Sequence, residues 1–528
     1  MNRKQKSVSL FGNKEIQAAF YFLLAGFLLT LFASRSSFLY PCNDWNDANS
    51  YFSMGKALFN GKMPYRDVFD QKGPYLYFLY GLAYLVSHTT FAGVYILEGI
   101  WAFLDLLGIY YIMRLYLKRN TALFLSPAVL AVIVSSKSFY WGGSAEEICF
   151  PFLVWGLYLS TEYFKNSYPE KSVSFKVLFA GGLLAGMVAN IKFTVLGFFF
   201  AWMMCMAFSF LAGKDFFGAV KGCLVFLGGM AVPFVPWLVY FGWNHGLYEW
   251  YWGYVYINVF IYSDLNGEGP GLYERIYTLS KLLYWVIRDN LIYFAFLIPG
   301  VLWFICTGKK RWLERFNLTA LCFFLFLGIY VGGSSLPYYA LPLAVFTVFG
   351  FVLMGGMAEF FAGKLFTGAE CAKSVPGEKE SGGKGSFRKR MRSFAAAALA
   401  LAVGAGIIWT GSMNISHMSE KKEDIFLYKF KEIVEQKENP TLLNIGCLDA
   451  GLYTVCDIVP TCRWFQTQTL AIDDVLKEQE RYIREGQTDF VIARDDYPDV
   501  IWEKYELAAQ EPWNQGELAF TYYLFKKM

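Results

Sequence analysis

Apolar stretches of about 20 residues recur along residues 16–411, and each is long enough to cross a bilayer as a helix. Within the hydrocarbon core only helices and closed barrels satisfy all of their backbone hydrogen bonds. Hydrophobic residues make up 56% of the 528-residue chain and charged residues 17%, whereas soluble proteins carry about 25% charged residues. The sequence therefore predicts a mainly α-helical protein that crosses a membrane many times.

The pattern of apolar stretches predicts about eleven spans. They lie at about 16–36, 91–115, 119–136, 146–163, two between 177 and 212, 216–241, 290–306, 316–333, 337–358 and 393–411. The basic N-terminus, "MNRKQKSVSLFGNK", has no small-residue cleavage site after it, so we expect it to stay in the cytoplasm. From that start, the Lys- and Arg-rich loops all fall in the cytoplasm, as the positive-inside rule requires.

Two domains are predicted. Residues 1–412 form the transmembrane domain, and residues 413–528 have soluble composition with alternating helix-like and strand-like stretches, which indicates a small extracytoplasmic α/β domain. Residues 359–392 are expected to be a cytoplasmic linker. Gly446 and Gly451 lack the GxGxxG spacing of a nucleotide site. The net charge of +4 is small, so a nucleic-acid partner is not expected.

Charges are concentrated in the first exported loop, residues 37–90, although apolar spans flank it. We expect two helices here that lie on the membrane surface, one in "DANSYFSMGKALFNG" and one in "PYLYFLYGLAYLVSH". Asp47 lies near the start of the first helix, where the helix dipole stabilises a carboxylate, and is expected to face a water-filled cleft. Arg66 and Lys72 could bind a phosphate, although exported cations are often interfacial anchors.

A second group of charges lies at the ends of later spans. Glu146 and Glu147, in "YWGGSAEEICFPF", lie where the fourth span enters from the outside. Carboxylates there are costly unless they face water or a partner, but acidic residues are also favourable in the first turn of a helix. We expect Glu146 to face the cleft. Lys192, in "ANIKFTVLG", is either a functional cation or one that reaches the interface with its long side chain.

Together these motifs resemble a known family. The first loop reads "DxxxYFxMGKALxxGxxPYRDxFDQKGPxLYF", and "GGxxEE", "KFT" and "LPYYALPL" follow in order. This set is similar to the GT-C glycosyltransferases, most of all to the bacterial branch of lipopolysaccharide glycosyltransferases, which is related to protein O-mannosyltransferases and aminoarabinose transferases. The resemblance covers roughly residues 10–412 and rests mainly on the segment 43–74 and its spacing to Glu146.

The resemblance implies a GT-C fold and an inverting transfer of a hexose or pentose from a polyprenyl-phosphate donor to a glycan, lipid or protein of the cell envelope. The reaction would take place at the outer face of the bacterial cytoplasmic membrane. Asp47 matches the acidic position expected to act as the base, and Glu146 matches the second acidic position, which positions acceptor or donor. Lys72 and Lys192 would hold the departing phosphate.

The remaining site residues follow from the same resemblance. Arg66, Asp70, Glu147 and Tyr338 are expected to contribute to substrate binding. Tyr338 follows a proline where many relatives have a His-Tyr pair, so no role of that His carries over to this chain. Some members of the family use a divalent metal, Mg or Mn, and others do not; Asp47 and Glu146 would be its ligands here.

Two other classes of protein fit part of the pattern. A transporter also has charges inside the membrane, but no inverted repeat or pair of broken helices is visible. A non-catalytic accessory protein of polysaccharide export would keep the spans without needing Asp47. The single large charged loop near the N-terminus favours an enzyme with its site at one face. The C-terminal domain is expected to recognise the acceptor or to cap the site.

Overall fold

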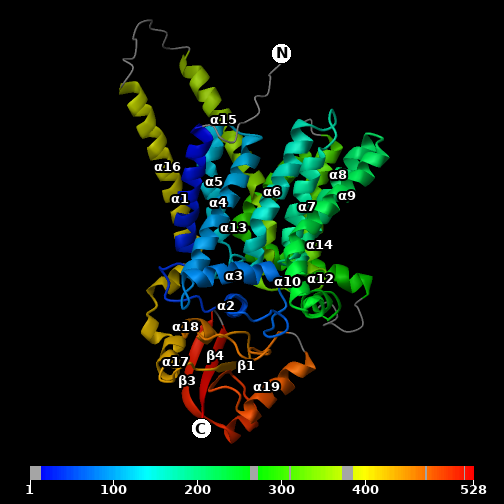
Figure 1. Cartoon of the computed structure of the whole chain (residues 1–528). Helices are drawn as coiled ribbons and strands as arrows, with labels where there is room; N and C mark the ends of the chain where they lie inside the picture. The colour runs from blue at the N-terminus through cyan, green and yellow to red at the C-terminus, as the bar shows by residue number, and fades with distance from the viewer. Residues whose placement is uncertain are drawn as a thin grey trace.

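The apolar stretches form helices that run side by side in one bundle (Figure 1). The computed structural model describes residues 13–261, 271–307, 311–333, 335–370, 384–469, 472–515 and 518–528. The helices up to the end of the bundle are α1 (Asn13–Ala33), α2 (Asn46–Phe59), α3 (Pro74–Val86), α4 (Ala92–Arg114), α5 (Arg119–Val134), α6 (Ala145–Asn166), α7 (Phe175–Ala189), η1 (Phe193–Val195), α8 (Leu196–Ala212), α9 (Phe216–Ala231), η2 (Val232–Phe234), α10 (Val235–Trp243), α11 (Leu247–Trp250), η3 (Tyr251–Ile261), α12 (Leu272–Asp289), α13 (Leu291–Cys306), α14 (Trp312–Tyr330), η5 (Pro337–Thr347), α15 (Val348–Glu370) and α16 (Lys384–Gly411).

The helices confirm a polytopic membrane protein, but not the count of eleven spans. Within the described ranges, 7 helical segments are long and apolar enough to cross a membrane, or 8 if α12 and α13, which meet at 111°, form one broken span. The difference has physical causes. Helices α5 and α7 have 16 and 15 residues, less than a straight crossing needs. Helix α6 has 22 residues, but its charged residues lower its hydropathy.

The first loop contains two helices, α2 and α3, that lie across the ends of the bundle (Figure 1). Helix α3 starts with Pro74, a residue that suits the first turn because it lacks an N–H group. The two helices touch at Gly55 and Gly81: a Cβ atom on Gly55 would lie 2.5 Å from the backbone nitrogen of Gly81. This contact brings the two backbones together and fixes where the helices cross.

The C-terminal part is a small α/β domain beyond α2 (Figure 1). Its elements are η6 (Met413–Ser419), η7 (Lys422–Asp424), α17 (Phe426–Val434), β1 (Leu442–Ile445), α18 (Leu452–Val455), α19 (Asp473–Glu485), β2 (Phe490–Arg494), η8 (Asp499–Glu503), β3 (Tyr505–Gln515) and β4 (Leu518–Lys527). The strand order is β1-β2-β4-β3, with β1 and β2 parallel and the other pairs antiparallel. The parallel pair needs the long connection that α18 and α19 provide.

Helices enter both ends of the predicted linker. Helix α15 continues to Glu370 and α16 begins at Lys384, so residues 359–370 and 384–392 are helical. Gly and Ser residues lower helix propensity, but the extension of an apolar helix by a few turns overrides this weak preference. Residues 371–383 lie outside the described residues.

The C-terminal domain contacts α2 through a buried carboxylate. Asp449 is fully buried and accepts hydrogen bonds from the Ser53 hydroxyl, at 2.5 Å, and from the Gly451 backbone N–H, at 2.7 Å. Burial raises the pKa of Asp449 from its ordinary 3.8 to about 6, although these hydrogen bonds and the charge of Lys56 oppose the rise. The folded protein therefore holds this proton more tightly than the unfolded chain does.

We predict that Asp449 makes stability fall as pH rises. Because its pKa is raised in the folded state, its contribution is fully present below about pH 4 and is lost as pH rises through about 6. At about 1.4 kcal/mol per pKa unit, the loss is about 3 kcal/mol. Asp449→Asn removes the charge, while the amide oxygen can accept from the Gly451 N–H and the amide nitrogen can donate to the Ser53 hydroxyl oxygen. The difference in unfolding free energy between wild type and variant, measured in detergent from about pH 4 to pH 7, should follow this curve; parallel pH profiles would contradict it.

Candidate active site

Asp47 is the centre of the candidate site. It is the second residue of α2 and is half-buried. Its carboxylate accepts hydrogen bonds from the Tyr51 hydroxyl, at 3.1 Å, and from the Tyr338 hydroxyl, at 3.3 Å. Tyr51 lies one helical turn further along α2, whereas Tyr338 comes from η5, almost three hundred residues later. The fold thus joins the first loop to a distant part of the bundle at this carboxylate.

The electrostatic surroundings of Asp47 suit a group that accepts a proton. Burial raises the pKa of Asp47, and the positive charges of Lys72 and then Lys192 oppose that rise, while the charge of Asp70 adds to it. A carboxylate with a raised pKa is a stronger base than a solvated one. The two lysines keep the charged form accessible.

A glycine brings the two lysines together. Lys192 lies in the break between α7 and η1, and Lys72 precedes Gly73 in the "QKGP" motif. The Gly73 N–H donates to the Ile191 carbonyl at 3.1 Å, and a Cβ atom on Gly73 would lie 2.0 Å from the Asn190 carbonyl oxygen. Only glycine allows this approach of the two backbones. The first loop is therefore held against the α7–α8 break, with a lysine from each side.

Lys192 is paired with Glu146 in the first turn of α6. The Lys192 ammonium and the Glu146 carboxylate form a buried ion pair, and the ammonium lies 3.9 Å from the centre of the Tyr339 ring. The second carboxylate oxygen of Glu146, Oε2, is buried and has no hydrogen-bond partner within the described part of the chain. We call Asp47, Lys72, Glu146 and Lys192 the charged cluster.

The conformation at the N-terminus of α6 is set by the three residues that precede it, Gly142, Gly143 and Ser144. Gly142 and Gly143 have φ angles of +86° and +79°, values that favour glycine. The Ser144 hydroxyl then caps α6 by accepting a hydrogen bond from the Glu147 N–H at 3.0 Å. This turn directs Glu146 and Glu147 to different surroundings.

A cavity of about 170 Å³ opens beside the charged cluster. Lys72 and Lys192 supply its cations, while most of the remaining wall is apolar or aromatic: Ile191, Phe193, Tyr254, Ile329, Val331 and Tyr339. Two cations next to an apolar wall match the chemistry of a phosphate with a hydrocarbon chain attached.

Of the other predicted residues, Tyr338 contacts the charged cluster through Asp47, whereas Arg66, Asp70 and Glu147 have hydrogen-bond partners outside it. Arg66 is exposed, forms an ion pair with Asp67 at 2.9 Å and donates to the Asn244 carbonyl. Asp70 accepts a hydrogen bond from the Tyr77 hydroxyl at 2.8 Å and is buried. Its partner Tyr77 accepts one from the Lys72 N–H at 2.8 Å, so Asp70 supports the backbone at Lys72.

Glu147 also lies apart from the charged cluster. Its carboxylate accepts a hydrogen bond from the Gly143 N–H at 2.7 Å and closes the turn that starts α6. Nearby, Glu98 accepts hydrogen bonds from the Ser34 hydroxyl at 2.7 and 2.8 Å. Glu98 was not among the predicted site residues, although a carboxylate within a predicted span is an available signal.

Aromatic residues around Asp47 were also missed. The Trp45 ring lies 4.8 Å from the Tyr338 ring and 5.4 Å from the Tyr140 ring, measured between centroids. Tyr51 contributes the second hydroxyl to Asp47. Aromatic residues are 20% of this chain, so their presence near a motif carries little information. A Tyr one helical turn after a candidate carboxylate was the usable signal.

The predicted metal ligands do not fit a metal site. Among the described residues, no group of three or more His, Cys, Asp or Glu side chains is placed to hold a metal ion. Glu146 is paired with Lys192, and Asp47 with two tyrosine hydroxyls.

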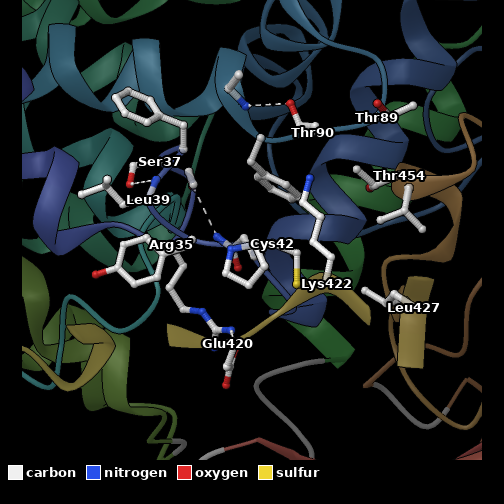
Figure 2. Close-up of a pocket in the computed structure, with 18 of the residues that line it drawn as sticks. Arg35, Ser37, Leu39, Cys42, Thr89, Thr90, Glu420, Lys422, Leu427 and Thr454 are labelled. Atoms are coloured by element: carbon white, nitrogen blue, oxygen red, sulfur yellow. Dashed lines mark hydrogen bonds and ion pairs between the residues drawn. The ribbon is translucent and has the colours of Figure 1, made fainter. Parts of the chain in front are cut away.

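A larger cavity, of about 360 Å³, lies between the first loop and the C-terminal domain (Figure 2). Arg35 extends toward Glu420 on its wall, with their ion pair at 3.4 Å, and Cys42 and Thr454 lie nearby. Arg35 also forms a buried ion pair with Asp44 at 2.8 Å. This cavity contains no member of the charged cluster.

No protein-family model and no curated protein matches this sequence. Solved structures do match. ArnT from Cupriavidus metallidurans, bound to undecaprenyl phosphate, superposes with a TM-score of 0.58 over 97% of this chain and 98% of its own, at 12% identity; its apo structure gives the same values. The archaeal oligosaccharyltransferase AglB from Archaeoglobus fulgidus gives a TM-score of 0.43 over 91% of this chain and 69% of its own, at 12% identity.

At this identity the likeness to ArnT concerns the fold alone. It extends over nearly the whole of both chains, so it includes the helical bundle, the first loop and the C-terminal domain. ArnT is a GT-C protein. The chain therefore has the GT-C fold, as its sequence motifs predict.

Proposed function

We propose that this protein transfers a sugar from a polyprenyl-phosphate donor to a hydroxyl group of a cell-envelope acceptor, with inversion at the anomeric carbon. The observation that carries the proposal is the charged cluster: Asp47 lies under the influence of Lys72 and Lys192, which line an apolar-walled cavity. The fold adds support, because a protein with the same fold, ArnT, has been crystallised with undecaprenyl phosphate.

The cavity would hold the donor. Lys72 and Lys192 would bind its phosphate, and the wall formed by Phe193, Tyr254 and Ile329 would contact the first part of the lipid chain. When the bond from the anomeric carbon to the phosphate oxygen breaks, the phosphate leaves with the electron pair and gains negative charge. Fixed cations stabilise that charge more in the transition state than in the ground state.

Asp47 would act on the acceptor. As the acceptor hydroxyl oxygen attacks the anomeric carbon, its proton passes to the Asp47 carboxylate. Tyr51 and Tyr338 hold this carboxylate in place from two sides. Oε2 of Glu146, which has no hydrogen-bond partner among the described residues, would accept a hydrogen bond from a sugar hydroxyl. A single displacement with one base and no covalent intermediate inverts the anomeric configuration.

The site would face the outside of a bacterial cytoplasmic membrane. Arg119 forms an ion pair with Glu15, and Arg311 with Glu170. These basic residues belong to loops that the positive-inside rule assigns to the cytoplasm. The charged cluster and the C-terminal domain belong to the opposite, exported side, where envelope acceptors are found. The N-terminus would then be cytoplasmic.

Asp47→Asn should lower turnover by about 100-fold or more, because the amide cannot accept the proton. The measurement is the release of undecaprenyl phosphate from a panel of undecaprenyl-phosphate sugars in membranes, with protein amount and thermal stability checked. Asp496→Asn, at an exposed carboxylate of the C-terminal domain, is the control and should behave as wild type. Release by Asp47→Asn at the wild-type rate would remove Asp47 as the base. Absence of release by wild type with every donor would favour a transporter or accessory protein.

Lys72→Gln should raise the donor KM by about 10- to 100-fold, since a charge-assisted hydrogen bond contributes about 1.5–3 kcal/mol. The same variant should bind undecaprenyl phosphate more weakly in calorimetry with the purified protein. Lys62→Gln removes a cation of the same loop that does not line the cavity, and serves as the matched control. Equal binding by wild type and Lys72→Gln would show that the phosphate lies elsewhere.

A further inference from the structure

Helix α2 has two polar faces with different partners. Asp47 and Tyr51, four residues apart, share the face that meets Tyr338. Asn46, Asn49, Ser50, Ser53 and Lys56 follow at helical spacing on another face, and every one of them contacts the C-terminal domain. The same short helix thus carries the candidate base and most of the polar contacts to that domain.

The contacts on the second face are buried and directional. The Gln466 amide donates to the Ser50 hydroxyl at 2.7 Å, and the Ser53 hydroxyl donates to Asp449 at 2.5 Å. Lys56 is fully buried and donates to the Tyr453 carbonyl at 2.9 Å. Leaving any of these buried groups without a partner is unfavourable.

Asp449 and Gln466 are themselves held in place. The Asp449 N–H donates to the Gln466 side-chain oxygen at 2.9 Å, and the Gly451 N–H donates to Asp449 at 2.7 Å. Asp449 and Gln466 are both fully buried. Asp449 and Gln466 are therefore linked to each other, and their side chains hydrogen-bond to Ser53 and Ser50, which lie one helical turn apart on α2.

The contact of α2 with α3 restrains the helix in a different way. At Gly55 the helix packs closely on Gly81 of α3, which fixes the distance between the two helices. Apolar packing of this kind is not directional, whereas hydrogen bonds lose strength steeply when their angles change. The hydrogen bonds from the C-terminal domain thus add a directional restraint on the rotation of α2 about its own axis.

We propose that Asp449 and Gln466 are positioning residues: their hydrogen bonds to Ser53 and Ser50 fix the rotation of α2 about its axis, and this rotation orients Asp47 toward Tyr338 and the cation-lined cavity. This inference rests on the proposed function for its catalytic part only. Displacement of a reacting group by about 1 Å can lower a rate by about 100-fold. The C-terminal domain then contributes to transfer without touching the donor.

The test compares Asp449→Ala and Gln466→Ala with Tyr428→Phe, in full-length protein in lipid nanodiscs. Tyr428→Phe removes another hydrogen bond between the C-terminal domain and the first loop, from Tyr428 to the Pro41 carbonyl at 2.9 Å, outside α2. The first measurement is kcat and KM for an undecaprenyl-phosphate sugar that wild type uses. The second is hydrogen–deuterium exchange of residues 46–59, with residues 74–86 as an internal reference.

Both alanine variants should lower kcat by about tenfold or more with an unchanged donor KM, and should speed exchange in 46–59 but not in 74–86. Tyr428→Phe should do neither. Ser53→Ala combined with Asp449→Ala should lower kcat no further than Asp449→Ala alone, because the two substitutions remove the same hydrogen bond. If Asp449→Ala does not fold, Ser53→Ala replaces it as the variant that removes this hydrogen bond. Asp449→Asn, whose amide can still hydrogen-bond to Ser53 and Gly451, should then fold and have a wild-type kcat.

Several results would overturn the proposal. Unchanged exchange in residues 46–59 would show that Asp449 and Gln466 do not hold α2. Faster exchange with wild-type kcat would show that they hold the helix without serving transfer. If wild type transfers no sugar from any donor, the proposed function fails on its own, and the exchange measurement still decides whether the C-terminal domain fixes α2.

Discussion

The close contact between Gly73 and the Asn190–Ile191 backbone is the constraint on which the candidate site depends. It holds the first loop against the break between α7 and α8, so that Lys72 and Lys192 come from two segments yet line one cavity. Charged side chains at the edge of a bilayer are costly unless they are paired. The contact brings each lysine within reach of a carboxylate, and so allows the charges to gather where the helices end.

The sequence predicted much of the fold because each span is a local property. About 20 apolar residues in a row leave a chain few alternatives in a membrane, and every predicted span contains a helix. The count was less secure because α6 mixes carboxylates with apolar residues, and α13 bends sharply away from α12. The crossover from β1 to β2 and the pairing of β2 with β4 depend on contacts that no local pattern specifies.

The candidate site was predicted less completely. The resemblance pointed to Asp47, Glu146, Lys72 and Lys192, which the structure gathers into one cluster, but their catalytic roles stay predictions. Arg66, Asp70 and Glu147 are close to these residues in sequence yet engage local partners, because a neighbour along the chain points in another direction. The hydrogen bond from Ser53 to Asp449 could not be seen in advance, since contacts between segments about 400 residues apart leave no periodic trace.

The charges of the cluster suggest how proton transfer and phosphate departure would assist each other. Its two lysines and two carboxylates sum to a formal charge of zero while Asp47 is ionised. A proton arriving at Asp47 from the acceptor leaves a net positive charge beside the cavity. In the proposed reaction the phosphate would leave its sugar at that moment and would gain one negative charge. The cluster thus becomes more positive as the leaving group becomes more negative, and fixed charges that strengthen their attraction along the reaction stabilise the transition state more than the bound donor.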